Sequence, residues 1–78
     1  MKYLILKTLN GYKVECEKKK TAPLADYLES VGGLSIVELR FPYWDKSTGC
    51  IIISSRISKD ELEAMVTDFE TVQIKSAL

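Results

Sequence analysis

The sequence predicts a small α+β protein with a single-layer, mostly antiparallel sheet and two helices on one face. Short segments alternate apolar and polar residues, a pattern typical of strands. Two longer segments repeat apolar residues at spacings of three and four, as amphipathic helices do. Asn10-Gly11 separates two apolar segments and favours a type I′ hairpin turn, which needs positive φ at both central positions. The predicted order is strand, strand, helix, strand, strand, helix, strand (ββαββαβ).

The first hairpin is predicted to join a strand over residues 2–9 to a strand over residues 12–17. Pairing Leu9 with Tyr12 sets the register and leaves one face suited to the core. The residues on this predicted core face are Tyr3, Ile5, Leu9, Tyr12, Val14 and Cys16. In this register Ile5 lies opposite Cys16.

Leu4 and Leu6 fall on the opposite face of the first strand. The segment from Tyr3 to Leu6 has no charge or proline, the devices that usually protect a sheet edge from pairing with another chain. A two-fold contact needs only one self-complementary patch. We therefore expect a homodimer through Leu4 and Leu6, formed by this strand or by the outer face of the sheet.

The first helix is predicted to begin at Thr21 and end at Val31. Thr21 is interpreted as the N-cap, and Pro23 follows within the first turn, where its missing N–H costs nothing. Gly32 is expected to end the helix in the left-handed conformation. The apolar stripe of this helix is Leu24, Tyr27, Leu28 and Val31.

Two strands follow, joined by a turn over residues 43–49. Residues 34–41 alternate apolar and charged side chains, and Pro42 stops this strand from continuing. The β-branched segment from Ile51 to Ile53 favours a central strand that is apolar on both faces. We expect truncation of Ile52 or Ile53 to destabilise the protein strongly. The predicted core residues are Leu28, Val37, Ile52, Ile53, Leu62 and Val66.

The second helix is predicted to follow a capping box formed by Ser58 and Glu61. Its stripe of Leu62, Met65, Val66 and Phe69 faces the core. The alternation over residues 71–75 then predicts a last strand.

Two arrangements of the strands remain open. A true hairpin gives a five-stranded variant, whereas one long bent strand over residues 2–17 gives a ferredoxin-like fold.

Composition narrows the class of protein. The 78 residues leave room for one domain, covering residues 1–78, and 46% hydrophobic residues are too many for a disordered chain. Basic and acidic residues both number 11, so no net charge attracts nucleic acid or an anionic membrane. The N-terminal apolar segment is too short for a signal or membrane segment, which makes the cytoplasm the expected location.

Cys16 and Cys50 lie in predicted strands and are expected to be buried thiols.

No catalytic or metal-binding constellation stands out, so no enzyme activity and no cofactor are predicted. The chain has no histidine, the commonest general base at neutral pH. Asp60, Glu61 and Glu63 would resemble a carboxylate cluster for a metal ion. Their position at a helix N-terminus explains them without a ligand, because acids are stabilised there.

Two surfaces are candidates for binding another protein. Tyr43 and Trp44 are adjacent aromatics in a turn, flanked by Arg40 and Lys46, and such residues dominate interface energies. The alternative for Trp44 is that it packs back over the edge of the core. The second candidate is the acidic face of the second helix, which presents Asp60 and Glu63 together with Thr67, Asp68 and Glu70.

The sequence therefore favours a small non-catalytic regulator or inhibitor that binds another protein. A virus-encoded inhibitor directed at a host system, in the host cytoplasm, is one member of that class. The alternative is a nucleic-acid-binding module in which Lys18, Lys19 and Lys20 contact phosphates.

Overall fold

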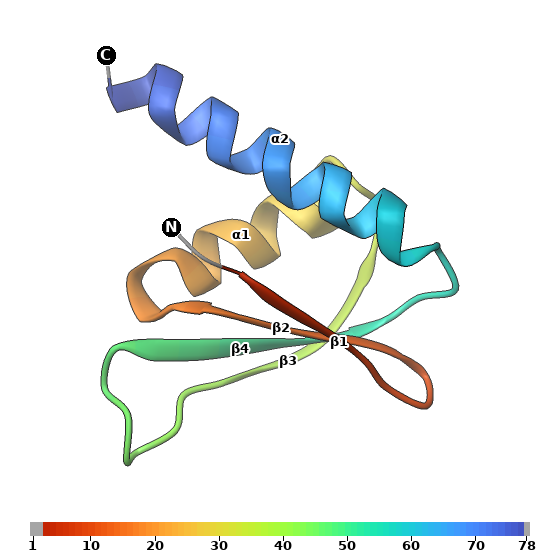
Figure 1. Cartoon of the computed structure of the whole chain (residues 1–78), viewed down its shortest axis with the longest axis horizontal. Helices are drawn as coiled ribbons and strands as arrows, with labels where there is room; N and C mark the ends of the chain where they lie inside the picture. Colours follow the sequence, from red (N-terminus) through yellow and green to blue (C-terminus); the bar gives the residue numbers. More distant parts are fainter. Residues whose placement is uncertain (1–2, 78) are drawn as a thin grey trace.

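The computed structural model describes residues 3–77, with side chains as far as Gln73. Its elements are β1 (Leu4–Lys7), β2 (Gly11–Glu17), α1 (Lys18–Ser30), β3 (Ser35–Arg40), β4 (Thr48–Ser54) and α2 (Lys59–Ala77). The strands form one sheet in the order β1-β2-β4-β3, and each neighbouring pair is antiparallel. Both helices lie over the same face (Figure 1). The predicted α+β class, with two helices on one face of the sheet, is confirmed.

The last predicted strand, over residues 71–75, is wrong, because α2 continues through it to Ala77. No glycine or proline separates Phe69 from Thr71, and extending an existing helix costs far less than nucleating a new element. The Thr71 hydroxyl donates to the Thr67 carbonyl at 3.1 Å, a contact typical of helices. The sheet therefore has four strands in the described residues, and the five-stranded variant is not formed.

The first hairpin is confirmed, which excludes the single long strand over residues 2–17 and the ferredoxin-like arrangement built on it. Its register differs from the prediction by two residues, since Ile5 lies opposite Val14. A shift of two keeps each side chain on its predicted face. Leu9 is the exception, because it now lies in the turn and is 98% exposed. Lys2, assigned to the first strand, lies outside the described residues.

Gly11 serves close packing rather than the turn. Neither Asn10 nor Gly11 has a positive φ, so the predicted type I′ turn is wrong. A Cβ at Gly11 would collide with the Ile53 carbonyl oxygen and lie 2.8 Å from the Ser55 nitrogen. The backbone of the β4 end therefore passes too close for any side chain at this position.

Helix α1 begins at Lys18, directly after β2, and not at Thr21. Thr21 is fully buried and its hydroxyl donates to the Glu17 carbonyl at 2.9 Å, so it is not the N-cap. Pro23 consequently lies inside the helix, where it cannot donate a backbone hydrogen bond. At the other end, Gly33 and not Gly32 has the left-handed conformation, with φ of 68°.

The start of α2 shows the Ser58 half of the predicted capping box. The Glu61 backbone N–H donates to the Ser58 hydroxyl oxygen at 3.1 Å. The preceding loop is tied to the sheet by the buried Tyr12, whose hydroxyl donates to the Ile57 carbonyl at 2.7 Å. The rings of Tyr27 and Phe69 lie 5.5 Å apart and join the two helices.

One hydrophobic core lies between the sheet and the helices. Its members include Val14, Leu24, Leu28, Ile51, Ile53, Leu62, Val66 and Phe69. Ile51 replaces the predicted Ile52, which points to the other face and is only partly buried. Val37 is 59% exposed, because a β-bulge between Ile36 and Glu38 displaces it from the ladder.

Cys16 and Cys50 are buried and form no disulfide with each other, as predicted. Burial raises the pKa of both thiols, because it disfavours the charged thiolate. The two side chains lie on opposite faces of the sheet, since Cys16 is in the core and Cys50 pairs with Arg40 on the face without helices.

The isoleucines of β4 give a direct test of which face is the core. We expect Ile51→Ala and Ile53→Ala each to lower the free energy of unfolding by about 2–5 kcal/mol, because each leaves a cavity. Ile52→Ala should cost clearly less, and Val37→Ala should stay within about 0.5 kcal/mol. Urea denaturation of the four variants measures this. Equal losses for Ile51→Ala and Ile52→Ala would contradict the observed orientation of β4.

Candidate protein-binding surface

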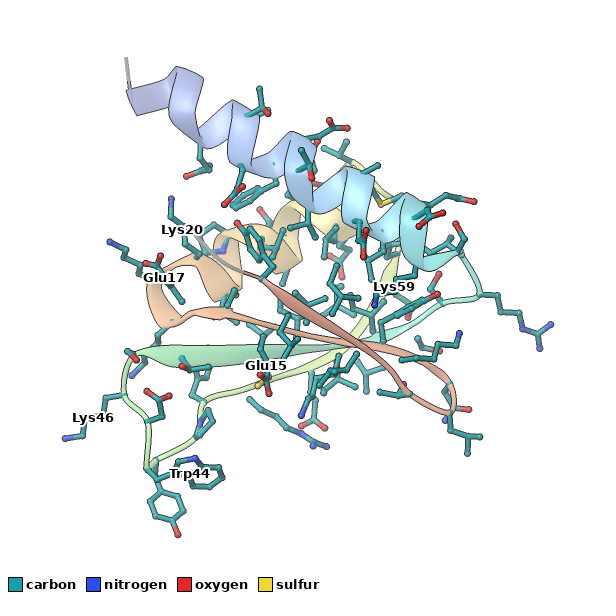
Figure 2. The ribbon with its side chains drawn as sticks, viewed as in Figure 1. Glu15, Glu17, Lys20, Trp44, Lys46 and Lys59 are labelled. Atoms are coloured by element: carbon teal, nitrogen blue, oxygen red, sulfur yellow. The ribbon has the colours of Figure 1, made fainter. Side chains whose placement is uncertain are left out.

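The loop between β3 and β4 presents two aromatic rings to solvent. Tyr43 is 86% exposed and Trp44 is 76% exposed. Their ring centroids lie 5.1 Å apart in a T-shaped arrangement, and Figure 2 shows Trp44 at the tip of the loop. The alternative in which Trp44 packs back over the core is therefore wrong. The two rings contact each other while most of their surface stays in water.

Asp45 holds this loop in shape. One carboxylate oxygen accepts hydrogen bonds from the Ser47 backbone N–H at 3.0 Å and from its hydroxyl at 2.7 Å. The other accepts from the Thr48 hydroxyl at 2.8 Å. These donors favour the charged form and lower the pKa of Asp45. The aromatic pair is therefore carried by a loop with a defined local structure.

A groove of about 1180 Å³ opens beside the loop, where β1, β2, β4 and α1 meet. We call it the lysine groove. Its apolar wall is formed by Tyr3, Leu4 and Phe41, and its cations are Lys18, Lys19 and Lys46. Glu15, Cys16, Glu17, Ser47 and Thr48 complete the lining. Phe41 is 46% exposed, so an aromatic surface is available in the groove as well as in the loop.

The groove exists because α1 starts against the loop. The Lys18 backbone N–H donates to the Ser47 carbonyl at 2.8 Å, which ties the first turn of the helix to the residues before β4. The Lys18 ammonium also lies 5.9 Å from the centre of the Phe41 ring, within the range of a cation–π contact.

The charge of the groove is unusual for the start of a helix. The first turn of α1 has no acidic residue and three lysines, Lys18, Lys19 and Lys20, at the positive end of the helix dipole. Lys19 lies 3.8 Å from Glu17, an exposed ion pair of little energetic value. Among the described side chains, no ion pair includes Lys18, Lys20 or Lys46. The groove therefore offers cations to a ligand that carries negative charge.

Tyr3 belongs to the apolar wall of the groove. Its hydroxyl is buried and has no hydrogen-bond partner among the described residues. Burial raises the pKa of Tyr3, and the nearby Glu70 raises it further. Sequence reasoning assigned Tyr3 and Phe41 to strands and missed them as surface residues, because only the meeting of distant segments exposes them in a groove.

The other predicted binding residues lie elsewhere. Arg40 projects from the sheet face without helices and pairs with Glu38 at 2.7 Å. It is not among the residues that line the lysine groove. Asp60 and Glu63 belong to the first turns of α2. Figure 2 shows Lys59, at the start of α2, well away from Trp44 and Lys46. The structure thus brings Lys46 together with Lys18 and Lys19 in the groove, with Tyr43 and Trp44 on the adjoining loop outside its lining. These residues are separated from the acidic helix face.

Comparison of the chain with protein-family models, with curated proteins and with solved structures finds no match. The residues in the described part of the chain include no group of three or more metal-ligating side chains. Within the same part, neither helix has the length and apolar character needed to cross a membrane.

The role of Asp45 predicts a pH-dependent loop. Its folded-state pKa is lowered, so its stabilising effect is present above the ordinary carboxyl pKa of about 4 and is lost as the pH falls through the folded value. Asp45→Asn should shift the emission of Trp44, the single tryptophan, at pH 7, and this difference from the unmodified protein should vanish well below pH 4. Asp68→Asn in α2 is the charge-matched control and should leave the emission unchanged. A pH-independent difference would show that Asp45 acts through its shape and not its charge.

Proposed function

We propose that this protein has no catalytic role and acts by binding another protein, as a regulator or inhibitor. The contact is made by the aromatic–lysine surface, defined as Phe41, Tyr43, Trp44 and Lys46 with Lys18 and Lys19. One observation carries the proposal: Tyr43 and Trp44 contact each other in a T-shaped arrangement and are exposed beside an open groove. Neither ring is needed for the core, which makes folding a poor explanation for their presence.

Several properties of this surface suit a protein partner. Tryptophan and tyrosine are the residues that most often dominate binding energy at interfaces. The two rings already hold each other, and Asp45 already orders the loop, so little conformational freedom is lost when a partner binds. The apolar wall of the groove continues the surface inward to Phe41 and Tyr3.

The charges indicate what the partner carries. Three lysines and two carboxylates, Glu15 and Glu17, line the groove. Glu15 pairs with Lys13, and Glu17 pairs with Lys19. A segment with carboxylates next to an apolar side chain would pair with Lys18 and Lys46 and cover Phe41. Covering a working surface of the partner is a route to regulation that needs no chemistry, and it is open to a virus-encoded inhibitor of a host protein.

Nucleic acid is the second candidate, favoured by Lys18 over the Phe41 ring and by Lys46 in the lining of the same groove. Bases stack on aromatic rings and phosphates pair with lysine. Two carboxylates in the same groove and a net charge of zero weigh against it. We expect no complex tighter than micromolar with an oligonucleotide at physiological salt.

Affinity purification of partners from a cell lysate tests the main proposal. Trp44→Ala should weaken the partner complex by about 30-fold or more, the effect of losing an interface anchor worth about 2 kcal/mol. Phe41→Ala should weaken it as well. Val72→Ala removes an exposed apolar side chain from α2 and is the matched control, with binding unchanged. Titration of the identified partner by calorimetry gives the affinities.

Stability of the variants separates a binding role from a folding role. Trp44→Ala should leave the free energy of unfolding within about 0.5 kcal/mol of the unmodified value, because the ring is mostly in water. Undiminished binding by both aromatic variants would contradict the proposed surface.

The lysines distinguish the two candidate functions. If they neutralise phosphates, oligonucleotide affinity falls with salt with a log–log slope of about −0.7 to −0.9 per contact. A nanomolar oligonucleotide complex that is lost when Lys18, Lys19 and Lys20 are replaced by glutamate would favour nucleic acid over a protein partner.

A further inference from the structure

The outer face, meaning the side of the sheet without helices, carries two complete rows of side chains across all four strands. The strand pairing defines them. The first row is Leu4, Glu15, Cys50 and Arg40, in the order β1-β2-β4-β3. The second row is Leu6, Lys13, Ile52 and Glu38 in the same order. Each row thus alternates apolar, charged, apolar and charged positions.

Three of the four apolar positions on this face are only partly covered within the chain, whereas Cys50 is 6% exposed. Leu4 is 50% exposed and Leu6 is 38% exposed, as the sequence predicted for this strand. Ile52 is partly buried, although it lies in a central strand. No helix in the described part of the chain covers this face, because both pack on the other side (Figure 1).

The charges on this face alternate in sign in both directions. On β2, Lys13 lies 3.4 Å from Glu15. On β3, Glu38 lies 2.7 Å from Arg40. The second row holds Lys13 of β2 and Glu38 of β3, whereas the first row holds Glu15 of β2 and Arg40 of β3. A pattern of this kind is complementary to itself when the two rows are exchanged.

We infer that the outer face binds a second copy of this chain. The two-fold axis lies in the plane of the interface, runs perpendicular to the strands and passes midway between the two rows. Rotation about this axis places the first row of one copy over the second row of the other copy. Leu4 then meets Leu6 of the second copy, and Ile52 lies over the position of the buried Cys50. On the charged strands, Lys13 meets Glu15 and Glu38 meets Arg40. Every apolar position is matched with an apolar one, and every charge with its opposite.

A two-fold axis parallel to the strands through the centre of the sheet does not give this match. It would place β1 over β3 and β2 over β4 of the second copy, so that Leu6 would meet Glu38 and Lys13 would meet Ile52. Burying charges against apolar groups is costly. The register of the sheet therefore selects the axis that crosses the strands.

The size of the face sets the strength of the dimer. Four strands about 4.8 Å apart and about six residues long cover roughly 400 Å² of sheet. A standard stable interface buries about 800 Å² on each partner, so this smaller contact belongs to the weak class of interfaces, and we expect the dimer to dissociate at roughly micromolar concentrations. Packed sheets align to within about 30° of each other because of their twist, which brings the middle of each face into the closest contact.

Charge reversal tests this arrangement. The contact between Lys13 and Glu15 of the second copy occurs twice in the dimer. Lys13→Glu alone places two carboxylates opposite each other at each of these contacts, and Glu15→Lys alone places two ammonium groups there. Each variant should be a folded monomer at roughly 100 µM, where the unmodified protein is a dimer. An equimolar mixture of the two variants should dimerise, because each supplies the charges that the other needs. The double variant Lys13→Glu with Glu15→Lys should dimerise by itself.

Sedimentation equilibrium measures the oligomeric state, and circular dichroism confirms folding of each variant. Lys59→Glu in α2 changes the charge equally without touching the outer face, and it should stay dimeric. Leu6→Lys should be a folded monomer, since the lysine would meet Leu4 of the second copy. Trp44→Ala should remain dimeric, because Trp44 is in neither row. A monomeric unmodified protein at this concentration, dimeric single reversals or a monomeric mixture would each overturn the inference.

Discussion

Close packing at Gly49 is the constraint on which the rest of this structure depends. A Cβ at this position would lie 2.9 Å from the Thr21 Cβ, so only glycine leaves room for the first turns of α1 on β4. The helix can therefore start directly after β2, with no loop between them. The Lys18 backbone then reaches Ser47, and Lys18 and Lys19 line a groove next to the loop that carries Tyr43 and Trp44. The lysine groove is thus a consequence of how closely a helix and a strand approach.

The one-sided arrangement of the helices determines the other surface. An antiparallel sheet buries one face and leaves the other in water unless another element covers it. Both helices are needed on one side to enclose the single core, which leaves Leu4, Leu6 and Ile52 among charged neighbours on the other. The alternating charges on β2 and β3 keep this face compatible with solvent, and they also fit the same pattern in a second copy.

Local sequence patterns predicted most elements but not their joins. The β1–β2 hairpin, the strands containing Val14 and Ile51, and the cap at Ser58 follow from alternation, branching and capping, which act over a few residues. The predictions that proved wrong lie where two such patterns compete for the same residues. Thr21 has the features of an N-cap, yet it is more stable when buried against Gly49 with its hydroxyl bonded to Glu17. The alternation after Phe69 suits a strand, yet the helix already in progress continues through it.

The sequence by itself determined the α+β class, the identity of most core residues and the presence of Tyr43 and Trp44 in a turn. These features depend on residue type and short-range spacing, which are properties of the chain before it folds. Only the tertiary structure decided that Phe41 and Tyr3 join Lys18 in one groove, and that the charges of β2 and β3 form two opposed rows. Such features depend on strand register and on the approach of segments distant in sequence, as at Gly11 against the Ile53 backbone and at Gly49 against the Thr21 side chain.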